Sequence, residues 1–194
     1  MQAIKGIEMD YTKGSIRKAI IMLAIPMILE MCMESVFALV DLFFVGHLPG
    51  ARHTIQTVSL TESVLSIIYS VAIGMSMAAA AMVARRVGEK NKDEAAHSAM
   101  QAIWLALAVT IVISATGIVF APDILRLMGA EPETIAMGSM YTRIDMGGSV
   151  VIMMLFLING IFRGAGNASM AMKSLWLANI CNIILCPILI RGFG

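Results

Sequence analysis

The feature that most constrains this chain is an apolar run from Ile20 to Val45 that contains three carboxylates, Glu30, Glu34 and Asp41. At about 100° per residue, an α-helix places these carboxylates within roughly 40° of one another, so one face of the helix is acidic. A helix of this length extends about 39 Å, which exceeds the hydrocarbon thickness of about 30 Å. The run therefore predicts a tilted or bent transmembrane helix with an acidic face.

The cost of these acids indicates that they have a role. An acid near the middle of a membrane costs about 2.5–3.5 kcal/mol on insertion scales, whereas Ile, Leu, Val and Phe each return about 0.3–0.6 kcal/mol. Insertion of this helix alone is then marginal, and its acidic face must meet water, cations or polar partners inside a bundle. We interpret Asp41 as a functional residue. For Glu30 and Glu34 two interpretations stay open: residues of a substrate cavity, or groups that only solvate a vestibule and assist helix packing.

Composition and span lengths predict the fold class. The chain of 194 residues is 59% hydrophobic and 14% charged, far from the soluble average of about 25% charged. Five apolar stretches are long enough to cross a bilayer. We therefore predict an all-α membrane protein, a polytopic bundle in the lipid bilayer, with spans at about 20–45, 58–83, 97–120, 139–161 and 174–190.

The distribution of basic residues predicts the orientation. The segments 1–19, 84–96 and 162–173 hold ten Lys and Arg residues, whereas the alternate connections hold three. By the positive-inside rule, the N-terminal segment 1–19 is cytoplasmic, and five spans then place the C-terminus outside. The net charge of +1 gives no reason to expect a nucleic-acid partner.

Two local patterns give further structural expectations. In the second span, Glu62, Ser66, Ser70, Gly74 and Ala78 follow one another at four-residue spacing, which favours a stripe that packs closely against a neighbouring helix. The segment 121–130 contains Pro122 near its start and Gly129 near its end, which predicts a separate short helix lying flat at the outer membrane surface.

The fifth span carries a second polar locus. Asn179, Asn182 and Cys186 share one helical face, and Pro187 frees a backbone carbonyl. These groups suit Na⁺ or water, yet asparagine in a membrane is also common as a hydrogen-bonding contact between helices, and both interpretations stay open. We interpret the three cysteines as free, buried thiols, and the sequence gives no sign of a structural metal site, a cofactor or an enzyme.

Several motifs, in order along nearly the whole chain, resemble those of the multidrug and toxic compound extrusion (MATE) transporters, in their N-terminal half. The motifs are Pro26-Met-Ile-Leu, Leu39-Val-Asp-Leu-Phe-Phe-Val-Gly46, Ala72-Ile-Gly-Met-Ser-Met77, Val87-Gly-Glu-Lys-Asn91, Phe162-Arg-Gly-Ala-Gly-Asn167 and Asn182-Ile-Ile-Leu-Cys-Pro-Ile-Leu-Ile190. No single motif is decisive, but the ordered set is fairly specific.

The resemblance implies two six-helix lobes that work by alternating access and exchange Na⁺ or H⁺ for organic cations and other amphipathic compounds. It implies that Asp41 couples transport to the cation. Many members carry Asn followed four residues later by Asp in the fifth helix, where this chain has Asn182 and Cys186. Glu30 and Glu34 lie outside the motif. The chain stops after the fifth span, so the expectation is a partial N-terminal lobe (20–194) whose partner is a C-terminal lobe or another membrane chain.

The functional expectation is a cation-coupled antiporter of the cell inner or plasma membrane, represented here by its N-terminal part. Its coupling residues would be Asp41, Asn182 and Asn179, and its substrate cavity would include Glu30, Glu34 and Cys186. Two alternatives remain. A flippase for lipid-linked substrates would keep the fold but favour a cationic cavity, and a non-transporting scaffold would tolerate neutralised acids without loss of ligand binding.

Overall fold

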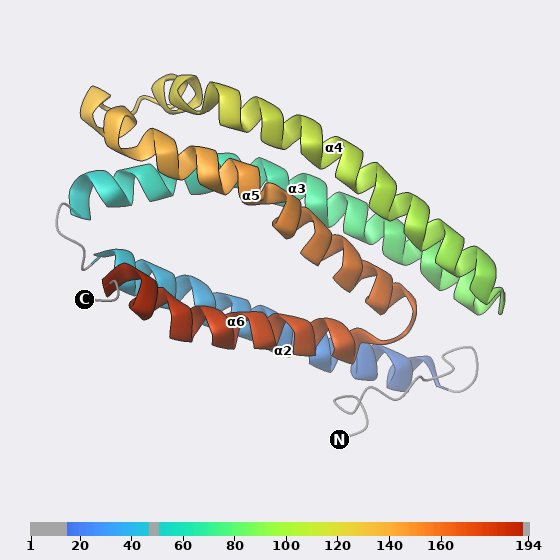
Figure 1. The fold of residues 1–194 in the computed structure, drawn as a ribbon. Coiled ribbons are helices and arrows are strands. Elements are labelled where there is room, and N and C mark those ends of the chain that lie inside the picture. The colour runs from blue at the N-terminus through green and yellow to red at the C-terminus, as the bar shows by residue number, and fades with distance from the viewer. Residues whose placement is uncertain (1–14, 47–50, 192–194) are drawn as a thin grey trace. The chain divides into compact units, whose positions relative to one another are not determined.

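The structure, a computed structural model, describes residues 15–46 and 51–191, which form five long α-helices (Figure 1). The helices are α2 (Ile16–Gly46), α3 (Ala51–Gly88), α4 (Lys92–Leu127), α5 (Pro132–Gly164) and α6 (Ala168–Arg191). All five are long and apolar enough to cross a membrane. The predicted fold class, a helical membrane protein with five spans, is therefore confirmed, and each helix contains one of the predicted spans. The N-terminal residues 1–14 lie outside the described residues.

Three of the turns share one capping geometry. Each helix end has a residue with positive φ, namely Lys90 (59°), Gly129 (81°) and Gly166 (84°). Each also has a backbone N–H that donates to the carbonyl five residues earlier, as in Asn91 N to Arg86 O at 3.0 Å and Asn167 N to Phe162 O at 2.8 Å. This is the Schellman cap, which satisfies carbonyls that the helix end leaves unpaired. It allows the chain to reverse direction within a few residues.

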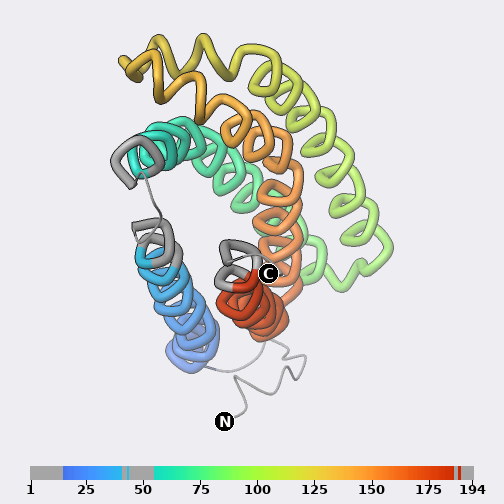
Figure 2. The backbone as a smooth tube through the Cα atoms, turned by 60° about the vertical axis from the view of Figure 1, so that its left-hand side comes forward, coloured from blue at the N-terminus to red at the C-terminus, as the bar shows by residue number. Residues whose placement is uncertain are grey.

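The chain divides into two compact units. Unit 1 comprises residues 1–44, 79–99 and 158–194, and unit 2 comprises residues 45–78 and 100–157. Unit 1 thus contains most of α2, all of α6 and the neighbouring ends of α3, α4 and α5. Figure 2 shows the path of the backbone through these helices.

Unit 2 is held together by a small apolar cluster and by hydroxyl pairs between helices. Leu65 and Ile68 of α3 pack with Met146 of α5. Thr61 and Thr142 form a buried hydrogen bond of 3.0 Å between α3 and α5. Ser114 and Ser149 form one of 2.8 Å between α4 and α5. Apolar burial drives little helix association in lipid, so buried hydroxyl pairs and close packing carry much of the specificity here.

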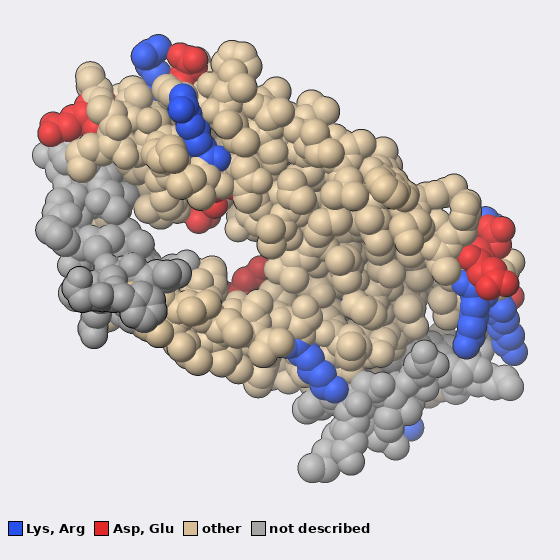
Figure 3. All heavy atoms as spheres, viewed as in Figure 1, with Lys and Arg blue, Asp and Glu red and all other residues tan. Residues whose placement is uncertain are grey.

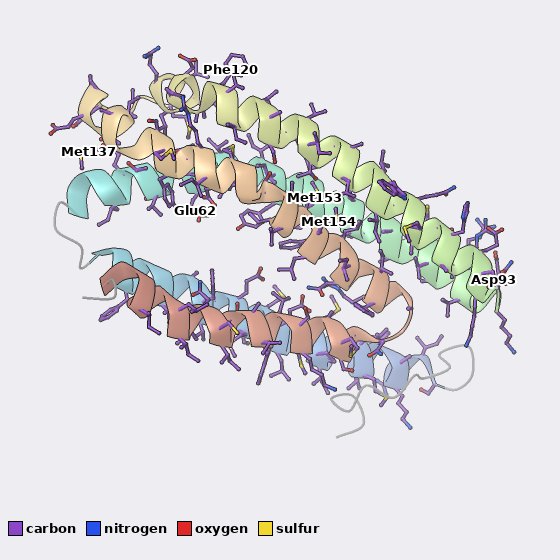
Figure 4. All side chains as sticks on the ribbon, viewed as in Figure 1. Glu62, Asp93, Phe120, Met137, Met153 and Met154 are labelled. Carbon is purple, nitrogen blue, oxygen red and sulfur yellow. The ribbon has the colours of Figure 1, made fainter. Side chains whose placement is uncertain are left out.

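The prediction for the small-residue stripe of α3 is wrong. Glu62, Ser66, Ser70, Gly74 and Ala78 are all exposed in the structure, and Figure 4 shows Glu62 on the side of α3 that is turned away from α4. A Cβ added at Gly74 would meet nothing within 4 Å. The buried stripe lies beside it and includes Thr61, Leu65, Ala72 and Ser76. Spacing of four residues marks a face but does not say which face a neighbour covers, and the hydroxyls of Thr61 and Ser76 find partners on α5.

The predicted separate helix at 121–130 is also wrong. Residues up to Leu127 continue α4, and Pro122 lies inside this helix. Ala121 and Leu125 are fully buried, so this segment packs into the chain and does not stand apart from it. Burial of these two side chains outweighs the tendency of Pro122 to interrupt a helix. The stop near Gly129 is confirmed, because Gly129 has positive φ just after the helix.

Charged side chains gather at the helix turns. On the face seen in Figure 3, basic and acidic groups cluster over the α3–α4 turn and the α4–α5 turn, and the middle of α4 between them is uncharged. In the α3–α4 turn, Arg85 Nε donates to Glu89 Oε1 at 3.0 Å, and Arg86 lies 3.2 Å from the same carboxylate. The hydrogen bond from Arg85 lowers the pKa of Glu89 below its usual value. The turn is therefore a charged cap suited to a water-facing membrane boundary.

Within unit 1 the end of α5 approaches α3 closely. Gly164 lies against the backbone of Ala80, and an added Cβ would come within 2.9 Å of the Ala80 Cα and 3.0 Å of its carbonyl carbon. Such an approach of two helix backbones needs a residue without a side chain. Gly164 thereby fixes the last turn of α5, which carries Arg163.

Candidate functional site

The first part of the site is the acidic face of α2. Glu30 is buried, with a relative exposure of 7%, whereas Glu34, one turn further along the same helix, is exposed. Asp41 lies in the helical part of α2, but its side chain is outside the described residues. The structure therefore separates two of the three predicted carboxylates by environment. Sequence periodicity alone treats them as equivalent.

Glu30 has an ionic partner in α5. Arg163 Nη2 lies 3.5 Å from Glu30 Oε1, and the exposed fractions of the two side chains are 25% and 8%. Arg163 Nε also donates to the carbonyl of Asn159, one turn earlier in α5, at 3.3 Å. A buried carboxylate needs a charge partner or hydrogen bonds, and Arg163 supplies the charge. The expectation that the acidic face meets polar partners is thus confirmed for Glu30.

Arg163 is not among the predicted site residues, because its place in the sequence marks it only as a basic residue of a predicted cytoplasmic connection. In the structure Arg163 occupies the last turn of α5, where the helix dipole favours a cation. Its long side chain allows the guanidinium to reach back toward the membrane interior. The signal that could have found it is the presence of an unpaired acid in one span and an arginine at the end of another.

The second part of the site lies on α6. Asn179 is buried, with a relative exposure of 6%, and Asn182 is partly buried. The two residues are three positions apart and so share one face of the helix. Cys186 lies in α6, but its side chain is outside the described residues. Cys32 and Cys181 are free thiols, as predicted, but both are exposed, so the prediction that they are buried is wrong for these two residues.

Three buried polar atoms of this unit are unpaired. Glu30 Oε2, Asn179 Nδ2 and Asn182 Oδ1 find no hydrogen-bonding partner in the described part of the chain. An unpaired polar atom away from water costs about 1–3 kcal/mol. Native structures keep few such atoms, and they concentrate where a ligand, water or ion binds. The structure thus brings Glu30, Asn179 and Asn182 into one unit and gives them free hydrogen-bonding capacity.

Other polar groups of the described residues differ from these three atoms. Over residues 15–46 and 51–191, no group of three or more His, Cys, Asp or Glu residues is arranged to hold a metal ion. Glu62 is exposed on α3 and belongs to unit 2. Ser66 and Ser70 donate to carbonyls of their own helix at 2.7 and 2.8 Å, so their hydroxyls are already engaged.

Comparison with known proteins agrees with this architecture. The family model described as MatE matches residues 26–188, which is most of the chain. The chain belongs to the MatE family. The matched region runs from Pro26 in α2 to Ile188 in α6, so it includes every residue of the candidate site, and the resemblance that the motifs indicated is confirmed.

Two curated relatives of this MatE chain carry names of multidrug export or resistance proteins. Multidrug export protein MepA of Staphylococcus aureus (strain bovine RF122 / ET3-1) is 24% identical over 183 residues, which cover 94% of this chain and 40% of MepA. Probable multidrug resistance protein YoeA of Bacillus subtilis (strain 168) is 26% identical over 184 residues, with the same coverage. This MatE chain therefore spans about two fifths of the length of these relatives.

Solved structures of MATE transporters show the same fold. A crystal structure of MATE in complex with MaD3S superposes with a TM-score of 0.86 at 29% identity, over 100% of this chain and 43% of the other. A MOP superfamily transporter from Pyrococcus furiosus gives a TM-score of 0.85 at 30% identity, over 100% and 42%. The five helices of this MatE chain thus correspond to less than half of a complete transporter.

Proposed function

We propose that this chain is part of the N-terminal lobe of a cation-coupled exporter of organic cations and other amphipathic drugs. The observation that carries the proposal is the polar site of unit 1, where the ion pair of Glu30 and Arg163 and the amides of Asn179 and Asn182 are set within membrane spans. Ionisable groups inside a membrane are rare and mark ion or substrate pathways. The named relatives, multidrug export and resistance proteins, support the same class of activity.

The proposal assigns roles to the residues. Asp41 exchanges the coupling cation, Na⁺ or H⁺, and Asn179 and Asn182 assist it from α6. Glu30, Glu34 and Cys186 contribute to the cavity that takes the cationic substrate. Alternating access requires two bundles around a central site, so the partners of this chain are the bilayer and a second lobe.

The orientation has its own test. We expect the N-terminus to be cytoplasmic. The basic residues are concentrated in the first, third and fifth polar segments, and such segments stay on the cytoplasmic side of the membrane. In a background with the three cysteines replaced by alanine, a cysteine at Lys92 in the α3–α4 turn should react with a membrane-impermeant maleimide only from the cytoplasmic side. A cysteine at Leu127, which is 90% exposed at the end of α4, should react only from outside. Labelling with the opposite sidedness would overturn the orientation.

The transport role of Asp41 is tested in the full reading frame that contains these 194 residues. The protein is reconstituted in sealed liposomes, and uptake of a fluorescent organic cation is followed under an imposed pH or Na⁺ gradient. We expect Asp41→Asn to reduce gradient-driven uptake by about 100-fold, because the amide cannot exchange a cation, and Glu62→Gln to reduce it by less than about threefold.

The two variants form a matched pair, since each removes one carboxylate charge from a membrane helix. Equal losses in both would show that diffuse negative charge, and not Asp41, supports uptake. If gradient-driven uptake is unchanged in both variants, the proposed function as a cation-coupled antiporter is wrong. Transfer of a lipid-linked substrate in place of the organic cation would point to the flippase alternative.

A further inference from the structure

We propose that the N-terminal ends of α2 and α6 form a surface that binds anionic phospholipids, with Arg17 and Lys18 of α2 and Lys173 of α6 as its cationic groups. In the expected orientation these helix ends face the cytoplasmic leaflet, which carries the anionic lipids of a membrane. Such a surface would hold lipid next to the chain whether or not the chain transports a drug.

The two helices begin at the same end of unit 1. Both belong to this unit, and Figures 1 and 2 show them next to each other. Arg17 and Lys18 lie in the first turn of α2, which begins at Ile16, and Lys173 lies in the second turn of α6, which begins at Ala168. All three basic side chains are exposed. Long basic side chains at such positions reach the headgroup region of a membrane.

The positive charge of these helix ends is not balanced by acidic residues close in the sequence. The first acidic residue of α2 is Glu30, and Arg163 lies 3.5 Å from its carboxylate. Helix α6 contains no acidic residue between Ala168 and Arg191. Residues 1–14 add two basic and two acidic residues, so they leave the net side-chain charge unchanged. The ends of α2 and α6 are therefore available to an external anion.

The α3–α4 turn of the same unit is basic as well, but it carries its own counter-charges. Arg85 and Arg86 lie 3.0 and 3.2 Å from the Glu89 carboxylate, and Arg86 lies 3.9 Å from that of Glu94. Figure 3 shows basic and acidic atoms together over this turn, whereas the basic group over the start of α6 has no acidic group beside it. A lipid phosphate would have to compete with carboxylates at the α3–α4 turn, and much less so at the ends of α2 and α6.

Exposed apolar side chains follow the basic groups one helical turn deeper. In α6, Trp176 and Leu177 are exposed three and four residues after Lys173, and in α2, Ile20 and Ile21 are exposed after the basic pair. Residues three and four apart share a helix face, so each helix presents a cation and then apolar surface. A phospholipid fits this order, because its phosphate meets the cation and its acyl chains meet the apolar side chains. Tryptophan is enriched at the same membrane level.

The experiment uses the full reading frame that contains these residues, reconstituted in phosphatidylcholine vesicles with a small fraction of lipid brominated near the top of the acyl chains. Bromine quenches nearby tryptophan, so the quenching that disappears in Trp176→Phe reports the lipid beside Trp176. Each basic residue near an anionic lipid contributes about fivefold to binding. We therefore expect brominated phosphatidylglycerol to be preferred over brominated phosphatidylcholine at this position by at least about fivefold. Lys173→Gln should lower the preference by about fivefold, and Arg17→Gln/Lys18→Gln/Lys173→Gln should abolish it.

Two further variants are the controls. Lys92→Gln removes one exposed lysine from the mixed-charge α3–α4 turn and should leave the preference unchanged, and Lys173→Arg keeps the charge and should retain the preference. Should Lys173→Gln fail to fold, as judged by circular dichroism, Lys173→Met keeps most of the aliphatic side chain and is measured in its place.

Four results would overturn the inference. They are equal quenching by the two brominated lipids in the unmodified protein, a preference that survives the triple variant, a loss in Lys92→Gln equal to that in Lys173→Gln, and a loss in Lys173→Arg. Soluble glycerol phosphate is added as a separate arm. If it removes the preference at millimolar concentration, the surface binds a free phosphate ester and the assignment to a lipid is wrong.

Discussion

Gly164→Ala should destabilise the chain by about 3 kcal/mol, near the upper end of the usual cost of overpacking. The added methyl group would overlap the carbonyl oxygen of Ala80 and come within 2.9 Å of its Cα. These are backbone atoms of α3, so they cannot rotate away as a side chain would. The two helices must separate, and the position of Arg163 at the end of α5 changes with them.

The measurement is unfolding in mixed detergent micelles, followed by circular dichroism. Gly74→Ala is the matched control, because it makes the same chemical change inside α3 with nothing within 4 Å of the new Cβ. Alanine is favoured over glycine within a helix by about 1 kcal/mol, so this control should be neutral or slightly stabilising. Similar losses in the two variants would show that helix α3 and the end of α5 are not closely packed.

The contrast between these glycines shows what the sequence could and could not predict. The five helices follow from apolar length, and the turns follow from residues such as Gly129 and Gly166 that accept positive φ. Both signals are local. Which face of a helix is covered depends on its neighbours, and the regular spacing of Ser66, Ser70 and Gly74 gave the wrong face of α3.

The candidate site shows the same division. Periodicity placed Glu30 and Glu34 on one face of α2, and it placed Asn179 and Asn182 on one face of α6. It could not show that Glu30 is buried and Glu34 exposed, because that difference depends on a contact with a residue 133 positions later in the chain. A pairwise contact of this kind leaves no periodic trace. Burial of an acid in a span does, however, require a partner, and this requirement can direct the search for one.

The second large effect is the contribution of the Glu30–Arg163 ion pair to stability, which a double-mutant cycle can measure. Glu30→Gln should destabilise the chain by about 2–4 kcal/mol, because it leaves Arg163 facing an amide in a largely dehydrated environment. Arg163→Gln should cost a similar amount, since it leaves a carboxylate buried without its counter-charge. The estimates lie somewhat below those for a fully buried pair because Arg163 keeps 25% of its side chain exposed.

The double variant Glu30→Gln/Arg163→Gln should recover at least about half of the larger single loss, because two amides of suitable length can hydrogen-bond to each other without any charge. The coupling energy is measured from unfolding of all four proteins in the same micelles. The cycle for Glu94→Gln and Asp123→Asn, two residues near opposite ends of α4, serves as the control and should be additive within about 0.5 kcal/mol. Additivity in the Glu30 cycle would mean that the 3.5 Å contact contributes nothing to stability.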